Sequence, residues 1–563
     1  MRSLVELDVL VVDCQATGAS PAFGHVLELG WGIQRASVAA VSGARAHWIR
    51  LPDGHEVPPQ IRKLTGYDPS FAAAAIADHE AWQRLRTDAG EGAAVPTAIH
   101  YARFELAFLR EWAERFEPGA PFPFDIVCVH AIARRLYPDL PRQSIRALAG
   151  YLGHSLELAR RSLGHVEATG FVWQKLREEL VARGVGDWDE LRAFLAERRA
   201  PVRPAPADKK PTYPIAPERY RTLPDAPGVY RFLRSNGDVL YVGKAASLKK
   251  RAASHFRGRA GTPQAPEMLT QVSDIAVTVV ASALEAALLE NETIKALRPP
   301  YNVHLVAKDL PVWYETPAFE GARAAPAEHH RLGPLPSESS LRPLAALVAL
   351  ARGEEPTETL RAQAVGVSAL FTPDEPVFAA GWAELVARHP RELGRDGPAR
   401  RRVTDLARKL LATSVLGETE GSSEEATEAL ETRSWDAPRV ARHVERALVQ
   451  AYRTYRRAHW LGLLCESDVL YREPNATRVR LLKVRAGVVV AAEDASFEHA
   501  PSERLRPLSL RERSPFDRAK YERLRVLTTE LKRIVRDGGE LAIHWGPRRR
   551  LPRRWLAGVL AAV

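Results

Sequence analysis

The sequence is poor in cysteine and in long apolar runs, and both shortages exclude whole classes of protein. Its three cysteines, Cys14, Cys128 and Cys465, lie far apart and form no CxxC pair, which argues against a disulfide scaffold and a thiolate zinc site. No run of roughly 18 apolar residues is present, so we expect no membrane span. Met1 leads directly into a strand-like run without the apolar core of a signal peptide, and we expect a cytoplasmic protein.

Length and charge narrow the remaining choices. The 563 residues are too many for one hydrophobic core, and a usual domain size of about 100–200 residues predicts three or four domains. Hydrophobic residues make up 45% of the chain and charged residues 26%, a balance typical of soluble globular proteins. There are 80 lysines and arginines against 69 acidic residues, and the resulting net charge of +11 favours a polyanionic partner.

Residues 223–305 contain the most informative pattern in the chain. Gly228-Val229-Tyr230 and Tyr241-Val242-Gly243 each lie on a short apolar run rich in valine, leucine and tyrosine. Asn236-Gly237 stands between the two runs, and Asn-Gly is a strong signal for a tight hairpin turn. The pattern therefore predicts two antiparallel strands with one tyrosine on each.

A helix, a strand and a second helix are predicted after this hairpin. Apolar residues recur at helical spacing from Leu248 to Phe256, and a β-branched run follows at residues 275–280. Ser282 has the character of a helix N-cap, with Glu285 three residues later as in a capping box. A pair of prolines then ends the second helix.

This arrangement resembles the GIY-YIG nuclease domain, most closely that of UvrC and the UvrC-like Cho nucleases. A single Gly-Val-Tyr or Tyr-Val-Gly would carry little weight, but six matching positions occur in order. They are Tyr230, Tyr241, Lys244, Arg251, Glu290 and Asn302. The resemblance implies a small α/β domain that cuts DNA with one divalent metal ion, Mg²⁺ or Mn²⁺.

The resemblance gives these residues roles that their chemistry can fill. Glu290 is one carboxylate, which suits a single Mg²⁺ that keeps several of its waters. Arg251 can hold a phosphate in a planar fork. Tyr241 would be the general base, and because a phenol ordinarily has a pKa of about 10, a cation such as Lys244 would help to form the phenolate.

The two other matching positions complete the implied site. Tyr230 would position the attacking water or share its proton, and Asn302 would brace the site. A plainer interpretation makes both tyrosines strand core and Glu290 a solvated helix residue. Each residue alone fits that interpretation, but all six at these spacings favour the nuclease.

Basic residues gather around the first helix of this domain. Lys249, Lys250, Arg257 and Arg259 lie close in sequence to Arg251. A solvated helix face is the alternative interpretation of such a cluster. Beside a phosphodiester-cutting site, we expect these residues to contact the DNA backbone.

The first 200 residues contain a second series of motifs. An apolar run, VLVVD, ends at Asp13, Thr17-Gly18 follows as a turn, and a helix begins with an HxxxF pattern at His100. A later helix contains ARRLYP, and a last one contains Ala168-Thr169. Over residues 5–180 this order resembles the ribonuclease-H-like 3′–5′ exonuclease domain of the DNA polymerase III epsilon-subunit type.

The catalytic positions of that family are mostly replaced. The family uses four carboxylates that hold two metal ions, and a histidine as general base. Asp13 is kept, whereas Gln15, Glu105, Arg160 and His165 stand at the other positions. Gln15 offers a neutral oxygen, and Arg160 brings positive charge where the base is expected. The resemblance therefore implies a degenerate DEDDh-type site.

We expect this first module to have lost exonuclease activity and to serve in DNA binding or docking. The alternative is a new site in which Asp13, Glu105 and His165 hold a single ion. Two divalent ions held by Asp13 and Glu105 alone would be poorly compensated in charge, which favours the inactive module.

The remaining sequence completes the predicted organisation. Residues 199–217 are rich in proline and indicate a semi-rigid linker between an exonuclease-type domain at 1–198 and a GIY-YIG domain at 218–306. Residues 307–563 indicate a mixed α/β region of unknown role, with DNA binding as one candidate. Within it, residues 418–432 are acidic and rich in serine and threonine, which indicates a flexible excursion.

Together these patterns predict a multidomain α/β protein that processes DNA near the nucleoid. We expect a repair endonuclease, directed to damaged or structured DNA, that hydrolyses one phosphodiester bond through the GIY-YIG domain. Two alternatives stay open: a dual nuclease with an active 3′–5′ exonuclease, and a non-catalytic DNA-binding adaptor. DNA is the expected partner, and the resemblance to UvrC makes loading proteins of the UvrA–UvrB type candidate partners in nucleotide excision repair.

Overall fold

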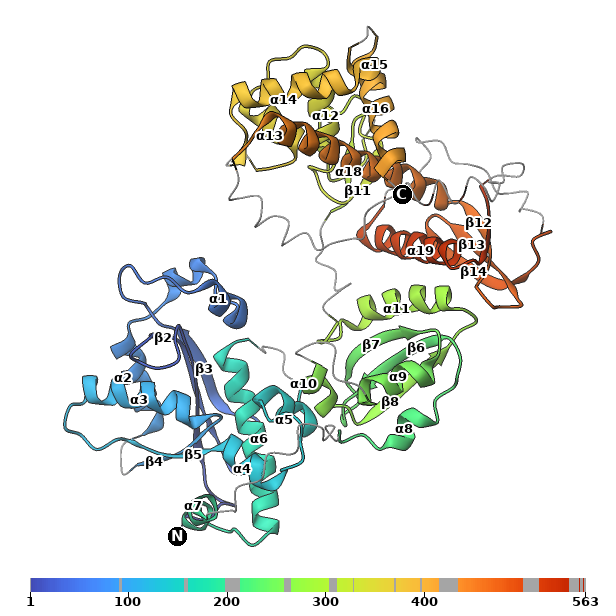
Figure 1. Cartoon of the computed structure of the whole chain (residues 1–563). Coiled ribbons are helices and arrows are strands. Elements are labelled where there is room, and N and C mark those ends of the chain that lie inside the picture. The colour runs from blue at the N-terminus through green and yellow to red at the C-terminus, as the bar shows by residue number, and fades with distance from the viewer. Residues whose placement is uncertain are drawn as a thin grey trace. The chain divides into compact units, whose positions relative to one another are not determined.

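The computed structural model describes residues 2–90, 94–155, 160–197, 213–257, 265–302, 311–327, 329–368, 371–394, 397–414, 434–499 and 516–545, with Leu556 and Leu560. Helices and strands occur along the whole of this described part (Figure 1), in agreement with the multidomain α/β class expected from the sequence. The chain divides into two compact units. Residues 1–281 and 297–303 form the first, and residues 282–296 and 304–563 form the second.

The first unit begins with a five-stranded sheet in the order β3-β2-β1-β4-β5 (Figure 1). Its strands are β1 (Val9–Ala16), β2 (Val26–Gln34), β3 (Ser42–Trp48), β4 (Val95–Ile99) and β5 (Phe124–Cys128). Strands β1, β2 and β3 pair antiparallel, whereas β4 and β5 run parallel to β1. The apolar run of β1 is buried, as expected of a strand that is covered on both faces. The sheet confirms the predicted ribonuclease-H-like fold.

Helices cover both faces of this sheet. They are α1 (Pro59–Thr65), a 3₁₀ helix (Pro69–Ala74), α2 (Asp78–Ala89), α3 (Ala102–Phe116), α4 (Val129–Leu136), α5 (Ile145–Tyr151), α6 (Ser162–Ala182) and α7 (Trp188–Ala196). Val11 of β1 packs in one core cluster with Trp173 of α6, and Val12 packs in another with Trp82 of α2. Because side chains alternate along a strand, the two clusters mark the two faces of β1.

A second sheet in the first unit carries the predicted hairpin. It is antiparallel, in the order β7-β6-β8, with β6 (Gly228–Leu233), β7 (Val239–Ala245) and β8 (Asp274–Val279). Gly237 in the turn has a φ of 89°, which glycine adopts without steric cost. Helices α8 (Pro217–Arg221), α9 (Leu248–Arg257) and α10 (Ala265–Thr270) belong to the same unit. The hairpin, the first helix and the third strand are therefore confirmed.

The end of the proline-rich segment belongs to the core of this second sheet. Tyr213 and Ile215 lie within the expected linker at 199–217, yet they are only 9% and 4% exposed. They share one core cluster with Tyr220 and Phe256, whose stacked rings have centroids 4.9 Å apart. The chain thus enters this core before residue 217, while residues 199–212 lie outside the described part.

The second unit contains helix α11 (Ala283–Leu297) and a largely helical region. The helices of that region are α12 (Arg342–Leu350), α13 (Glu358–Val365), α14 (Glu375–Arg388), α15 (Pro390–Leu393), α16 (Ala399–Ser414) and α18 (Ala437–Leu464). They share a core with a small sheet in the order β10-β9-β11, made of β9 (Trp313–Glu315), β10 (Ala322–Arg323) and β11 (Leu332–Leu335). The expected acidic excursion at 418–432 lies outside the described residues.

A four-stranded antiparallel sheet lies near the end of the second unit. Its order is β14-β13-β12-β15, with β12 (Ser467–Arg472), β13 (Val479–Arg485), β14 (Val488–Ala495) and β15 (Glu540–His544). Helix α19 (Arg518–Arg536) packs on this sheet. Leu284 and Leu288 of α11 belong to the same core cluster. Helix α11 therefore packs on this sheet, which lies far from it in the sequence.

No helix in the described part of the chain is both long enough and apolar enough to cross a bilayer.

Candidate nuclease sites

The β6–β7 hairpin brings the two tyrosines of the first motif together. Tyr230 pairs with Gly243 across the hairpin, and Tyr241 pairs with Phe232. The rings of Tyr230 and Tyr241 have centroids 6.1 Å apart. Tyr230 is fully buried and Tyr241 is half-buried, so Tyr241 is the tyrosine with the better access to a substrate.

Gly243 is required by the position of the Tyr230 ring. A Cβ built at Gly243 would overlap the hydroxyl and the adjoining ring carbons of Tyr230. That ring is itself packed between Phe232 and Tyr241. The Tyr-x-Gly pattern on β7 thus reflects a close approach of backbone to ring rather than a need for backbone flexibility.

His255 on α9 is a partner of the site that the sequence analysis missed. The Tyr230 hydroxyl lies 2.8 Å from Nε2 of His255. Burial, assisted by the positive charge of Arg251, lowers the pKa of His255 to about 4, so the imidazole is neutral at neutral pH. A neutral imidazole nitrogen can accept a hydrogen bond from a phenol, which satisfies the hydroxyl of the buried tyrosine.

Asn302 bonds both polar backbone atoms of one residue in β7, Val242. Its Oδ1 accepts a hydrogen bond from the Val242 amide at 2.9 Å, and its Nδ2 donates to the Val242 carbonyl at 2.9 Å. Val242 lies between Tyr241 and Gly243, and Asn302 is only 7% exposed. The contact fixes the segment of strand that carries Tyr241.

The charged members of the motif lie on three different elements. Lys244 at the end of β7 and Arg251 on α9 are exposed, whereas Glu290 is half-buried on α11 in the second compact unit. The expected DNA-contacting residues Lys249, Lys250 and Arg257 are also exposed. Arg259 lies outside the described residues.

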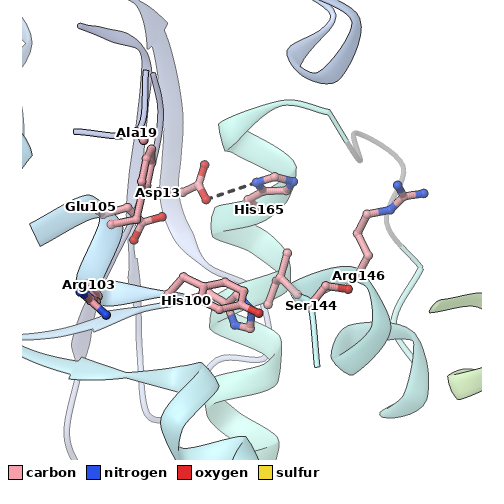
Figure 2. A pocket seen from close by; sticks show the side chains of 11 residues that line it. Asp13, Ala19, His100, Arg103, Glu105, Ser144, Arg146 and His165 are labelled. Atoms are coloured by element: carbon pink, nitrogen blue, oxygen red, sulfur yellow. Dashed lines mark hydrogen bonds and ion pairs between the residues drawn. The ribbon is translucent and has the colours of Figure 1, made fainter. Parts of the chain in front are cut away.

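A cavity of about 630 Å³ opens in the exonuclease-like domain at the positions predicted for its site (Figure 2). Asp13 of β1, Glu105 of α3 and His165 of α6 all line it, together with His100. Figure 2 shows the Asp13 carboxylate facing the His165 ring, with Nδ1 3.2 Å from Oδ1. The fold therefore brings together three of the five positions named from the sequence.

Burial favours the uncharged forms of Glu105 and His100 in this cavity. Glu105 is 4% exposed, and burial together with the neighbouring Asp13 raises the pKa of its carboxyl well above the ordinary value. His100 is 6% exposed, and burial lowers its pKa to about 3. Glu105 therefore tends to keep its proton while His100 stays neutral.

The other two positions do not contribute to the cavity. Gln15 uses its side-chain amide to donate a hydrogen bond to the Arg160 carbonyl at 2.7 Å, and the Arg160 side chain is exposed. Across the part of the chain that the structure describes, no cluster of three or more His, Cys, Asp or Glu residues is arranged to hold a metal ion. The single-ion site considered for Asp13, Glu105 and His165 thus gains no support from the geometry.

A hydrogen-bonded connection links the cavity to the second sheet within the first unit. Ser144, which lines the cavity and caps α5, donates to Glu267 of α10 at 3.0 Å. Arg146, also in the lining, lies 3.6 Å from the same carboxylate. Glu267 in turn accepts from the Tyr301 hydroxyl at 2.8 Å. Tyr301 precedes Asn302, so the connection ends beside the β7 brace.

Comparison with known proteins identifies the hairpin domain. Residues 226–303 match the family model described as the UvrC-like GIY-YIG domain. UvrABC system protein C of Methylococcus capsulatus is 46% identical over 123 residues, which cover 20% of this chain and 20% of that protein. The solved GIY-YIG endonuclease domain of UvrC from Thermotoga maritima, bound to magnesium, is 32% identical over 15% of this chain and 93% of that chain, with a TM-score of 0.14.

A longer match includes the first module. A Mycobacterium tuberculosis protein named as a bifunctional exonuclease/endonuclease is 29% identical over 366 residues, which cover 62% of this chain. The chain spans 53% of that relative's length and 20% of the length of the Methylococcus UvrC. The chain therefore carries a UvrC-like GIY-YIG nuclease domain behind an exonuclease-like N-terminal region, as the sequence predicted.

Proposed function

We propose that this protein is a DNA repair endonuclease that hydrolyses one phosphodiester bond through its GIY-YIG domain, at damaged or structured DNA. The observation that carries the proposal is the tyrosine pair on the hairpin, in which Tyr230 bonds to the neutral His255 and Tyr241 remains accessible. The match of residues 226–303 to the UvrC-like GIY-YIG domain supports it.

The roles of the tyrosines follow from their surroundings. Tyr241 would act as general base on the attacking water, and the exposed cation Lys244 on the same strand would favour its phenolate. Tyr230 would orient that water, with its hydroxyl held by a hydrogen bond to His255, which lies 2.8 Å away. Arg251 would bind the scissile phosphate.

The donor set fits one divalent metal ion. Glu290 offers carboxylate oxygen, the ligand that Mg²⁺ and Mn²⁺ prefer, and one carboxylate leaves room for the waters that Mg²⁺ retains. When bound, such an ion would stabilise negative charge on the phosphate and on the leaving oxygen. Asn302 would hold the strand that carries Tyr241 through its two bonds to Val242.

Nicking of supercoiled and lesion-bearing plasmid in Mg²⁺ or Mn²⁺ tests the proposal. We expect the wild-type protein to nick and Glu290→Ala to lose at least about 1,000-fold in rate, because the metal ligand is removed. Glu354→Ala, at an exposed glutamate of the helical region, is the matched control and should nick normally. Equal nicking by the wild type and Glu290→Ala would show that Glu290 is not the metal ligand.

We also propose that the exonuclease-like domain binds or docks DNA without cutting it. Gln15 and Arg160 lie outside the cavity's lining, and Glu105 favours its protonated form, so the two-metal chemistry of the family has too few ligands. The alternative, a dual nuclease, is favoured by the name of the Mycobacterium relative and by the Asp13–His165 pair.

Release of mononucleotides from 3′-labelled single strands separates these two possibilities. We expect neither the wild-type protein nor Asp13→Ala to release label in Mg²⁺ or Mn²⁺. Asp53→Ala, at an exposed aspartate of the same domain, is the control for nonspecific effects. Metal-dependent release by the wild type that Asp13→Ala abolishes would establish the dual nuclease instead. A non-catalytic adaptor would be indicated only if Glu290-dependent nicking also failed.

The division of the chain stays a proposal as well. We divide it into an exonuclease-type domain at 1–198, a linker at 199–217, a GIY-YIG domain at 218–306 and a C-terminal region at 307–563. The buried Tyr213 and Ile215 favour a linker that ends near residue 212. Loading proteins of the UvrA–UvrB type and a role in nucleotide excision repair follow only from the similarity to UvrC.

A further inference from the structure

Helix α11, which carries Glu290, has one face fully engaged by the C-terminal sheet and α19. Leu284 and Leu288 of α11 are buried in the core cluster of that sheet. Glu292 and Lys295 continue the same stripe with spacings of four and three residues, which are the spacings of one helix face. Each of these four residues contacts the C-terminal region.

The first turn of α11 is held by β12 and β13. The Glu285 carboxylate accepts hydrogen bonds from Arg480 at 2.8 Å and from the Tyr471 hydroxyl at 3.2 Å. The Leu284 amide lies in the first turn, where an amide has no acceptor within its own helix. It donates instead to Glu473 at 2.9 Å. Both Glu285 and Arg480 are largely buried, with side chains 15% and 12% exposed.

The residues that hold this turn are themselves held in place. Glu473 receives a second partner in Arg533 of α19 at 3.0 Å, and Arg480 also pairs with Asp494 of β14 at 2.6 Å. Burial, with the neighbouring Glu285, raises the pKa of Tyr471, so its phenol stays protonated and able to donate. The contacts therefore join the helix to a rigid, multiply bonded surface.

The last turns of α11 are held by α19. Lys295 pairs with Glu522 at 2.8 Å, and Glu292 pairs with Arg523 at 3.0 Å. Glu522 is also bonded to Arg518 at 2.7 Å, so the acceptor is fixed by a second cation. Polar contacts thus occur at both ends of the helix, with apolar packing between them.

Glu290 lies on the opposite side of α11 from this stripe. It is two residues from both Leu288 and Glu292, and at about 100° per residue this places it about 160° around the helix from each. The contacts with the C-terminal region described above therefore lie on the side of the helix away from the carboxylate.

We infer that the C-terminal sheet and α19 form a platform that holds helix α11, and with it Glu290, in place, with Arg480, Glu473, Glu522 and Arg523 as positioning residues. The inference rests on the proposed function, because it takes Glu290 to be the metal ligand. A carboxylate must be held within roughly 0.5 Å of its productive position to bind metal well. A helix fixed at both ends by a separate region of the chain meets that demand.

The dependence of nicking on metal concentration tests the platform in the full-length protein. We expect Arg480→Ala to raise the half-activating Mn²⁺ concentration at least about fivefold, with most of the rate recovered at saturating metal. Loss of folded protein alone would lower the maximal rate and leave that concentration unchanged. Arg478→Ala is the matched control, since Arg478 contacts only Asp494 among the described residues and is 77% exposed.

A charge exchange at the other end of α11 provides an independent test. Arg523→Glu places two carboxylates together and should raise the half-activating concentration about threefold, and the added Glu292→Arg should restore it. Unchanged metal dependence in both Arg480→Ala and Arg523→Glu, or failure of the exchange to restore it, would overturn the platform.

Amide hydrogen exchange separates this inference from the proposed function. Peptides covering residues 283–297 should exchange at least about threefold faster in Arg480→Ala than in the wild type or Arg478→Ala. Faster exchange in Arg480→Ala, when even the wild type does not nick, would support the platform and contradict the proposed endonuclease function. Unchanged exchange would overturn the platform whether or not the protein nicks.

Discussion

The hairpin site and the exonuclease-like cavity are two nuclease-type sites on one chain, and they differ in how their buried polar groups are partnered. On the hairpin, Tyr230 bonds to His255, and Asn302 bonds both polar backbone atoms of one β7 residue. In the cavity, one carboxylate oxygen of Asp13 and one of Glu105 are buried without a hydrogen-bond partner among the described residues. A buried unpartnered polar group costs about 1–3 kcal/mol, a cost that these two acids carry and that Tyr230 and Asn302 avoid.

The difference is in keeping with the proposal that the exonuclease-like domain does not cut DNA. Glu105 lowers the cost of its burial by favouring the protonated form, and His100 does so by staying neutral. Gln15 has turned to the Arg160 carbonyl. An inactive site of this kind would keep its acids but lack the concentrated negative charge that holds two divalent ions.

Among the substitutions that compare the two sites, the largest loss of stability and nicking rate should come from adding a methyl group beside the Tyr230 ring. Gly243→Ala would place a methyl group against the Tyr230 hydroxyl and ring. We expect a loss of about 3 kcal/mol in the free energy of unfolding and at least 10-fold in nicking rate, because the buried ring must move. Urea denaturation and plasmid nicking measure the two effects.

Gly186→Ala in the exonuclease-like domain is the control for this substitution. A Cβ at Gly186 would meet only the end of the Glu190 side chain, at 3.6 Å. We expect a change below about 0.5 kcal/mol, as at an ordinary surface position. Equal effects at the two glycines would contradict the idea that the Tyr230 ring makes Gly243 necessary.

Much of the hairpin could be predicted from the sequence because its signals are local. The Asn-Gly turn, the two strand runs and the Ser282 cap depend on neighbouring residues, and each was found where expected; the Ser282 hydroxyl accepts from the Glu285 amide at 3.1 Å. His255 was missed as a site residue because its partner lies on another element. Its spacing of three residues from the buried Ala252 did place it toward the core face of α9.

Other features left no local signal at all. A capping box suggested that Glu285 would turn back to its own helix end, but its carboxylate also binds Arg480, which is 195 residues away. Ion pairs of that kind depend on tertiary packing, and no periodicity in the sequence records them. The lining of the cavity by Asp13, Glu105 and His165 was anticipated only through the resemblance to the exonuclease family.

A second expected effect concerns pH and the buried histidine of the hairpin. The pKa of His255 is about 4 in the folded protein, against roughly 6.5 when unfolded. Because the unfolded chain binds the proton more readily, stability is complete above about pH 6.5 and falls as the pH drops toward 4. The shift corresponds to about 3 kcal/mol at most, and the partial exposure of the ring reduces this to about 2 kcal/mol.

Urea denaturation between pH 4 and 7 measures this dependence. His255→Gln keeps a polar partner for Tyr230 without a titrating group, so its stability should fall less over the same range. His100→Gln provides the comparison at the other site, since burial also lowers the pKa of His100, to about 3. A pH dependence that survives unchanged in His255→Gln would show that this histidine does not control it.

The smallest expected effect concerns the connection between the two sites through Glu267. This carboxylate accepts from Ser144 on the cavity side and from the Tyr301 hydroxyl on the hairpin side, with Arg146 3.6 Å away. Tyr301→Phe removes one hydrogen bond to Glu267 and one to Gln271, so we expect a loss of about 1 kcal/mol in the free energy of unfolding. Arg146→Ala, at a pair that is partly exposed, should cost about 0.5 kcal/mol.

A double-mutant cycle decides whether these residues act together. If Glu267 joins the two sites, Arg146→Ala and Tyr301→Phe should be non-additive by at least about 0.5 kcal/mol in urea denaturation. The hairpin rate should then fall two- to threefold in each single variant, because Tyr301 precedes the Asn302 brace. Arg142→Ala is a suitable control, because Arg142 is exposed and precedes α5 in the same domain. Additive energies and an unchanged nicking rate would mean that the cavity and the hairpin share a surface but remain energetically separate sites.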